Sequence, residues 1–296
     1  MMITSVVKQP VFARQQPSLD DVLLTPLVTM ALQEDLGRRG DVTSQATIPA
    51  DKTAKLEIKV RDDGVICGMD LARLSFALVD ANVQFVAHVA DGDKVQAGDK
   101  LATVSGNARH LLTAERTALN FMTHLSGIAT ATWQVVDLVA DYHAQITCTR
   151  KTIPGLRSLQ KYAVRCGGAR NHRLGLDDAI LIKDNHIAIA GDIATAMQQA
   201  QALAGHLVPI EIEVDTLEQL EQALAAGAKL VLLDNMNMDT LSQAVNMCRG
   251  RALTEASGGV TPTTVVDIAK TGVDFIAMGY LTHSSKALDI GLDFIN

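Results

Sequence analysis

Apolar and polar residues alternate through the first third of the chain in the manner of short strands. KLEIKV (residues 55–60) places an apolar side chain at every second position, which is the spacing of a strand with one buried face. Asp91-Gly92 and Gly98 then interrupt the apolar runs that follow, as residues of tight turns do. The pattern predicts a small β-rich layer over residues 55–106.

Apolar residues recur at helical spacing on both sides of this layer. TPLVTMALQEDLG (residues 25–37) predicts an amphipathic helix that ends at Gly37. Residues 110–141 predict a second helical stretch, and we expect a break in it near Ser126 and Gly127.

After Gln145 the pattern changes to strands that alternate with helices. Six apolar runs predict strands: QITCTR (145–150), AILIK (179–183), VPIEIEV (208–214), KLVLLD (229–234), RALTEAS (251–257) and VDFIAMG (273–279). Helical stretches lie between them at residues 194–205, 217–227, 238–248 and 263–272. A βα repeat of this kind predicts a parallel sheet or a barrel.

Polar residues and glycines stand at or near the carboxyl ends of the predicted strands: Arg150, Lys183, Glu213, Asp234, Ser257 to Gly259, and Gly279. An α/β barrel builds its active site on that face from many strands, whereas an open doubly wound sheet binds ligands only around its switch point. Contributions from six strands therefore favour a barrel. Because fewer than eight strands are visible, we expect it to be incomplete.

Composition narrows the class of protein. A chain of 296 residues with 48% hydrophobic content can bury a large core in one or two domains. A net charge of -7 and 3% aromatic residues argue against nucleic-acid binding. No apolar run approaches the roughly 18 to 20 residues of a membrane helix, and the N-terminal MMITSVVKQPVFARQQPS lacks a signal-peptide core. We therefore expect no membrane association and a cytoplasmic location.

Positive charge gathers in one segment of this acidic chain. Residues 149–186 contain eight lysines or arginines and three acidic residues, and potentials add where like charges converge. A solvated basic face is the alternative. However, paired glycines at Gly167 and Gly168 and the nearby His172 suit close backbone approach and directed hydrogen bonds. The segment predicts a site for a strongly negative small molecule.

Acidic residues on the later strands supply the opposite charge. Glu211 and Glu213 lie two positions apart, so both point to one side of their strand. Two buried carboxylates are costly unless they are paired with cations or a metal. With Asp234, they would face Lys151 and Lys183. A structural ion-pair network is the alternative, most of all for Glu211, and Glu213 is the preferred candidate for chemistry because it lies nearer the strand end.

Two glycine-containing loops add a candidate phosphate site. SGGV (residues 257–260) and Gly279 follow late strands and precede helical runs, as phosphate-binding loops of barrels do. Neither a Walker A motif nor a dinucleotide fingerprint nor a metalloprotease motif is present, and the four scattered cysteines include no C-x-x-C pair. The sequence thus combines cations, carboxylates and phosphate loops.

These motifs together resemble the quinolinate phosphoribosyltransferase family. The resemblance rests on TRKTIPGLR (149–157), YAVRCGGARNHR (162–173), LIKDNH (181–186), LDNM (233–236), SGG (257–259) and GVD (272–274), and extends upstream to EDLGRRGDVTS and AERTALNFMTHLSGIAT. It covers nearly the whole chain in order.

The resemblance implies a subunit of two domains. An N-terminal α/β sandwich would span residues 1–125 and be joined by the C-terminal tail, residues 281–296. An open α/β barrel with the active site would span residues 126–280. It further implies a homodimer or an assembly of dimers, in which Arg116 completes the active site of the neighbouring subunit.

The resemblance also implies a reaction and the residues that serve it. Quinolinate would react with phosphoribosyl pyrophosphate to give nicotinate mononucleotide, pyrophosphate and CO2, with Mg2+ bound through the substrate pyrophosphate and Glu213 and Asp234 as further candidate ligands. The quinolinate carboxylates would bind Arg116, Arg150, His172, Arg173 and Lys183. Phosphoribosyl pyrophosphate would bind Lys151, Glu213, Asp234, Ser257, Gly258 and Gly279, of which Lys151, Glu213 and Asp234 are the candidate catalytic residues.

One residue departs from the family pattern, and three other functions stay open. Cys148 stands where the pattern generally has Asp before TRKT; we interpret it as a packed thiol rather than a catalytic group. The alternatives are a relative with another substrate, as in proteins associated with molybdenum transport, a phosphometabolite-binding protein without catalysis, and a Schiff-base aldolase that uses Lys151 or Lys183. The remaining cations of the basic segment, among them Lys161, are expected to support the site or to lie at the surface.

Overall fold

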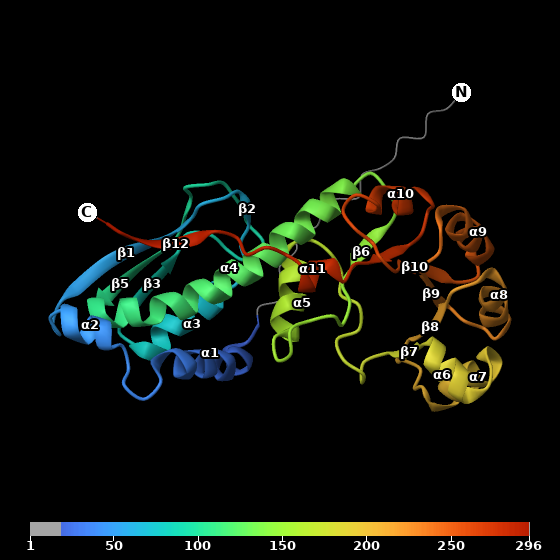
Figure 1. Cartoon of the computed structure of the whole chain (residues 1–296), viewed down its shortest axis with the longest axis horizontal. Coiled ribbons are helices and arrows are strands. Elements are labelled where there is room, and N and C mark those ends of the chain that lie inside the picture. Colours follow the sequence, from blue (N-terminus) through green and yellow to red (C-terminus); the bar gives the residue numbers. More distant parts are fainter. Residues whose placement is uncertain (1–18, 296) are drawn as a thin grey trace, which may run out of the picture.

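The computed structural model describes residues 19–295, and two sheets lie toward its opposite ends with one long helix running between them (Figure 1). Two predictions concern residues outside this range. One is the pair of outer domain limits at residues 1 and 296, and the other is the lack of a signal-peptide core in the N-terminal segment. None of the described helices combines the length and the apolar character that crossing a bilayer requires.

The helices are α1 (Asp21–Leu36), α2 (Val42–Thr47), α3 (Met69–Val79), α4 (Ala108–Leu138), α5 (Arg157–Cys166), α6 (Asp184–Ala190), α7 (Ile193–Leu203), α8 (Leu217–Ala225), α9 (Met238–Cys248), α10 (Val265–Lys270) and α11 (Tyr280–His283). The strands of the first sheet are β1 (Thr53–Val60), β3 (Gln84–Ala87), β5 (Lys100–Asn107) and β12 (Ile290–Phe294). Those of the second are β6 (Gln145–Thr147), β7 (Ile180–Ile182), β8 (Ile210–Val214), β9 (Leu230–Asp234), β10 (Leu253–Ser257) and β11 (Phe275–Ala277), while β2 (Gly64–Val65) and β4 (Lys94–Val95) form a small ribbon.

The first sheet is antiparallel in the order β12-β1-β5-β3. The alternation of KLEIKV predicted a strand with one buried face, and this is confirmed. Leu56, Ile58 and Val60 are buried in a core shared with α3 and α4. The C-terminal strand β12 returns across the molecule to pair with β1 (Figure 1). The C-terminal segment is thereby tied to the first sheet.

One helix in this region was not predicted. We expected only strands and turns over residues 55–106, which is wrong for α3. Its buried residues include Met69, Ala72 and Phe76, which recur at the helical spacing of three to four. The helical period was missed because the apolar stretches within α3 are as short as those of a buried strand and lie among short strands.

The second sheet is parallel in the order β6-β11-β10-β9-β8-β7. All six predicted strands are present, and helices lie along the outside of the sheet (Figure 1). Within the described residues β6 and β7, the two edge strands, do not pair with each other, and only a single bridge joins Thr147 to Arg170. The fold class is therefore as expected: an α/β layer followed by an open, incomplete α/β barrel.

Helix α4 spans both parts of the molecule without a break (Figure 1), so the expected break at Ser126 and Gly127 is wrong. The Ser126 hydroxyl binds the backbone N–H and C=O of Cys67 at 2.9 and 3.1 Å. A Cβ on Gly127 would lie 2.0 Å from the carbonyl oxygen of Lys286. Both residues serve close packing of other segments against the helix, and neither ends it.

We predict that Gly127→Ala destabilises the protein although alanine favours a helix by about 0.5–1 kcal/mol. The added methyl meets a backbone oxygen that cannot move alone, and overpacking of this kind costs about 1–3 kcal/mol. Urea unfolding measures the net effect. The matched control is Gly205→Ala, where a Cβ meets nothing within 4 Å; an equal or higher stability of Gly127→Ala would contradict the packing argument.

Candidate functional site

The carboxyl ends of the parallel strands surround a hollow of about 480 Å³. Nine of the residues singled out in the sequence line it: Arg150, Lys151, His172, Arg173, Lys183, Glu213, Asp234, Ser257 and Gly258. Residues that are up to 108 positions apart in the chain thus meet in one place, because parallel strands end at the same edge of a sheet.

Of the residues assigned to the substrates or to catalysis in the sequence, two do not line this hollow. Gly279 borders it, since a Cβ there would lie 3.0 Å from Cδ of Lys151. Arg116 is exposed on α4, and its expected role concerns a neighbouring subunit, so that role stays a prediction.

Arg150 and Arg173 bring two positive charges together without neutralising them. The Nε atom of each guanidinium is buried and has no hydrogen-bond partner within residues 19–295. Nη1 of Arg173 donates to the carbonyl of Ala179 at 3.0 Å, which fixes the direction of this side chain. Burial and the like charge of Arg150 lower the pKa of Arg173 below its ordinary value. A bound anion would relieve this repulsion.

Acidic groups complete the opposite wall. Glu213 on β8 is ion-paired with Lys183, which follows β7 directly. Asp234 ends β9 and accepts a hydrogen bond from Nδ2 of Asn235 at 2.6 Å. The hollow therefore presents cations at one side and carboxylates at the other.

Lys161 anchors the loop that carries two of the site residues. Its side chain is 1% exposed, and Nζ donates to the carbonyls of His172 and Arg173 at 2.8 Å each. Nζ also lies 3.2 Å from Sγ of Cys148, which donates to Oδ1 of Asn171 at 3.4 Å. Cys148 is thus a buried thiol that joins the strand to the loop by hydrogen bonds.

A buried acidic residue that the sequence did not single out lies below the hollow. Glu255 on β10 is 3% exposed and accepts a 2.6 Å hydrogen bond from the Thr147 hydroxyl. Nε2 of His172 lies 2.8 Å from Glu211 and 3.9 Å from Glu255. The sequence prediction considered residues at strand ends, and it therefore missed Glu255, which lies in the middle of its strand. Its position two residues before Ser257, and hence on the same strand face, was the available signal.

The SGG loop requires glycine at one position. Gly258 has φ of 96°, and a Cβ there would lie 2.1 Å from Oδ1 and 2.8 Å from the backbone nitrogen of Asn235. Asn235 itself is left-handed, with φ of 53°, and its N–H donates to the carbonyl of Ser257 at 3.0 Å. The loops after β9 and β10 are therefore locked together at the rim of the hollow.

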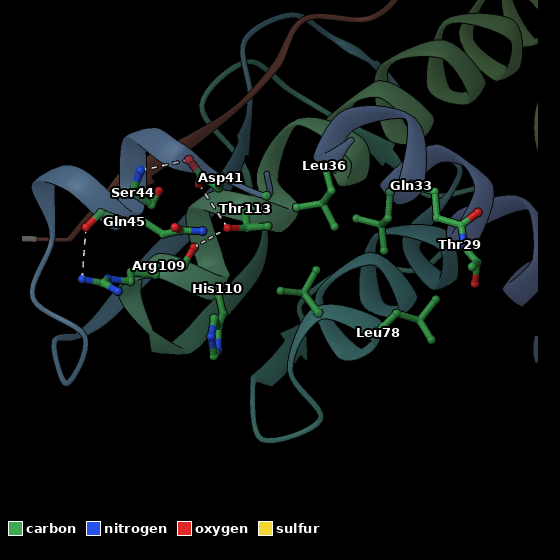
Figure 2. Close-up of a pocket in the computed structure, with 13 residues that line it drawn as sticks. Thr29, Gln33, Leu36, Asp41, Ser44, Gln45, Leu78, Arg109, His110 and Thr113 are labelled. Atoms are coloured by element: carbon green, nitrogen blue, oxygen red, sulfur yellow. Dashed lines mark hydrogen bonds between the residues drawn. The ribbon is translucent and has the colours of Figure 1, made fainter. Parts of the chain in front are cut away.

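Another hollow, of about 670 Å³, lies beside α1, α2 and α4 (Figure 2). Its polar groups already bind one another. Asp41 accepts from the Ser44 N–H at 2.9 Å and from the Thr113 hydroxyl at 3.1 Å, and Arg109 donates to the carbonyl of Gln45 at 3.3 Å. It offers no convergence of unmatched charges, so we place the chemistry in the barrel.

Comparisons with known proteins agree on one family. Residues 41–126 match the model of the quinolinate phosphoribosyl transferase N-terminal domain, and residues 128–293 match that of its C-terminal domain. The chain is 48% identical over 271 residues to the carboxylating nicotinate-nucleotide pyrophosphorylase of Mycobacterium leprae, covering 90% of this chain and 95% of that protein. It is 44% identical over 275 residues to the probable carboxylating enzyme of Bacillus subtilis, covering 93% and 94%.

A solved structure shows the same architecture. The nicotinate-nucleotide pyrophosphorylase of Francisella tularensis superposes with a TM-score of 0.90 at 42% identity, covering 95% of this chain and 99% of that one.

We predict that Lys161→Met loosens the loop that carries His172 and Arg173. The substitution leaves two buried carbonyls unpaired, at roughly 1–3 kcal/mol each. Urea unfolding should show the loss. The matched control is Lys229→Met, at an exposed lysine, which should stay near wild-type stability; equal stability of the two variants would refute the anchoring role.

Proposed function

The chain belongs to the quinolinate phosphoribosyltransferase family, and from this premise we propose how its residues carry out the family's reaction. The protein is a carboxylating nicotinate-nucleotide pyrophosphorylase. It joins quinolinate to phosphoribosyl pyrophosphate and forms nicotinate mononucleotide, pyrophosphate and CO2, a step of NAD biosynthesis.

The observation that carries the assignment of the acid-binding wall is the unmatched pair of guanidinium groups at Arg150 and Arg173. Guanidinium groups bind carboxylates through two parallel hydrogen bonds, so two of them suit a planar diacid. His172 and Lys183 line the same hollow and would complete the contacts to the two carboxylates. Lys183 is already held by Glu213 in an ion pair, and this contact is a reason to prefer the diacid site over a Schiff base.

The rim of the hollow suits the sugar phosphate. The 5-phosphate would lie against Ser257, Gly258 and Gly279, where backbone N–H groups can approach an anion closely. Lys151, exposed at the edge, would offset the charge of the pyrophosphate. Displacement of pyrophosphate develops positive charge on the anomeric carbon, which carboxylates of the opposite wall can stabilise.

The residues present fit a magnesium ion that is held mainly by the substrate. Carboxylate oxygen is a ligand that magnesium prefers, and Asp234 faces the hollow with Nδ2 of Asn235 as its side-chain partner. Glu213 is engaged by Lys183, so we assign it to charge stabilisation and not to metal binding. When bound, the ion would neutralise charge on the leaving pyrophosphate.

Decarboxylation needs no organic cofactor in this scheme. Ribosylation turns the ring nitrogen into a pyridinium, whose positive charge accepts the electron pair that the departing carboxylate leaves at C2. The substrate is thus its own electron sink.

We propose further features of the assembly. We propose a boundary between the sandwich and the barrel at residues 125 and 126. It is supported by the two family models, the first of which ends at residue 126 and the second of which begins at residue 128. Arg116, exposed on α4, would reach the site of a second subunit in a homodimer or an assembly of dimers. The cytoplasmic location stays a prediction from the sequence.

The direct test supplies the protein with quinolinate, phosphoribosyl pyrophosphate and magnesium, and measures nicotinate mononucleotide and CO2. We expect both products in equal amounts, with no CO2 when phosphoribosyl pyrophosphate is left out. Absence of product across pH and salt conditions would refute the assignment.

We predict that Arg150→Lys raises the KM for quinolinate by about 10- to 100-fold, the equivalent of one charged hydrogen bond at about 1.5–3 kcal/mol. The lysine keeps the charge but loses the two-point geometry. Steady-state kinetics measure the effect, with Arg249→Lys at an exposed arginine as the control. An unchanged KM would show that Arg150 does not bind the acid.

A further inference from the structure

Three titratable side chains meet inside the barrel beneath the substrate hollow. Atoms of His172, Glu211 and Glu255 all lie within 4.8 Å of one another. Both glutamate side chains are only 5% exposed and that of His172 is 13% exposed. Two carboxylates and one imidazole so close together cannot all carry full charge without cost.

One proton shared between the glutamates accounts for an unpartnered oxygen in this cluster. Oε1 of Glu211 is buried and has no hydrogen-bond partner within residues 19–295, and a protonated Glu255 could donate to it. Burial and the charge of Glu211 raise the pKa of Glu255 to about 7. Near neutral pH the pair thus holds a proton that can be exchanged.

His172 connects this pair to the substrate hollow. Its Nε2 is engaged by Glu211, while Nδ1 has no partner among the described residues. Burial lowers the pKa of His172, but the hydrogen bond to Glu211 and the charges of both glutamates outweigh burial and raise it. The ring is therefore protonated more readily than a free imidazole.

A separate hollow of about 520 Å³ gives access to the pair from the amino-terminal end of the strands. Glu211, Glu255 and Thr147 line it, together with the first residues of several strands, such as Leu230 and Phe275. His172 and Arg173 line both hollows and separate them. Water can thus reach the glutamates while substrate fills the upper hollow.

The reaction consumes a proton at C2, because hydrogen replaces the departing carboxylate. Guanidinium groups of the upper hollow do not release protons. Lys183 is ion-paired with Glu213, and Lys151 is assigned to the pyrophosphate. His172 is the remaining lining residue with a proton that can be transferred near neutral pH.

We propose that His172 is the acid that protonates C2 after CO2 leaves, and that Glu211 and Glu255 store and return its proton through the lower hollow. This proposal rests on the proposed function. His172 would be the catalytic residue, and the two glutamates act through it.

The step balances in atoms and electrons. The bond between C2 and its carboxylate carbon breaks, CO2 leaves, and the electron pair stays on C2. That pair takes the proton from Nδ1 of His172, which forms the C2–H bond and leaves a neutral imidazole. His172 regains a proton from the Glu211–Glu255 pair, and the pair takes one from water.

The proposal predicts a pH dependence of this step alone. Glu211, Glu255 and the nearby cation of Lys161 are the charged groups that act on His172, and Glu211 and His172 act on Glu255. A proton donor is lost as pH rises, so the rate of CO2 release should fall above about pH 7. The rate of ribosyl transfer, which needs no such donor, should not show this fall at high pH.

The test measures pyrophosphate and CO2 separately during the first and the later turnovers, with quinolinate in excess and labelled in its 2-carboxyl group. CO2 held beside the carbanion recombines until C2 is protonated, so a missing proton delays net release. In Glu255→Gln we expect the first turnover to match the wild type, because it uses the proton already on His172. Later turnovers should release CO2 about 100-fold more slowly, because His172 is no longer recharged from the pair. The carboxylated nucleotide should accumulate. Glu57→Gln, at a buried glutamate of the first sheet, is the control and should resemble the wild type.

Later turnovers of Glu255→Gln at the wild-type rate, or a first turnover that is slowed as much as the later ones, would overturn the proposal. If that variant does not fold, the wild-type pH profile of the first turnover decides: an identical fall in the rates of pyrophosphate and CO2 formation at high pH would also overturn it. Absence of pyrophosphate in the wild type would count against the proposed function instead.

Discussion

The site depends on holding two like charges together. Arg150 and Arg173 converge with buried, unpartnered Nε atoms, an arrangement that raises the free energy of the empty site until an anion binds. The fold supports it through groups that bind no substrate: Lys161 holds the carbonyls of the loop, and Ala179 holds the Arg173 guanidinium. We propose that folding thereby preorganises the site for a diacid.

The parallel strands arrange the charges in two levels. On β8, Glu213 lines the substrate hollow and Glu211 lines the hollow below it. On β10, Ser257 likewise lines the substrate hollow and Glu255 the lower one. The period of two in a strand sets this order. We propose that the upper level binds the substrates and stabilises charge, and that the lower level stores a proton. His172 lines both hollows, and in this proposal it links binding of the acid to its later decarboxylation.

Local pattern predicted much of this structure because the parallel strands are marked by both apolar runs and polar ends. Helix α9 has the predicted bounds, and every predicted strand is present. Apart from helix α3, what the sequence left wrong or open depends on contacts that are distant in sequence. Gly127 was expected to break a helix, but its lack of a side chain instead lets Lys286 pack against it. The sequence left open whether Lys161 supports the site or lies at the surface, and the loop carbonyls around it show the supporting role. The proposed role of Glu255 depends on its closeness to Glu211 and His172, which lie on other segments of the chain.

The central claim is that the guanidinium pair is preorganised for a planar diacid. Calorimetric titration of the protein with quinolinate, and with pyridine rings that bear only one of the two carboxylates, tests it most directly. The account predicts that the diacid binds at least about tenfold more tightly than either monoacid, a difference of about 1.4 kcal/mol, and that added salt weakens the diacid most. Equal affinity for the diacid and a monoacid would contradict it.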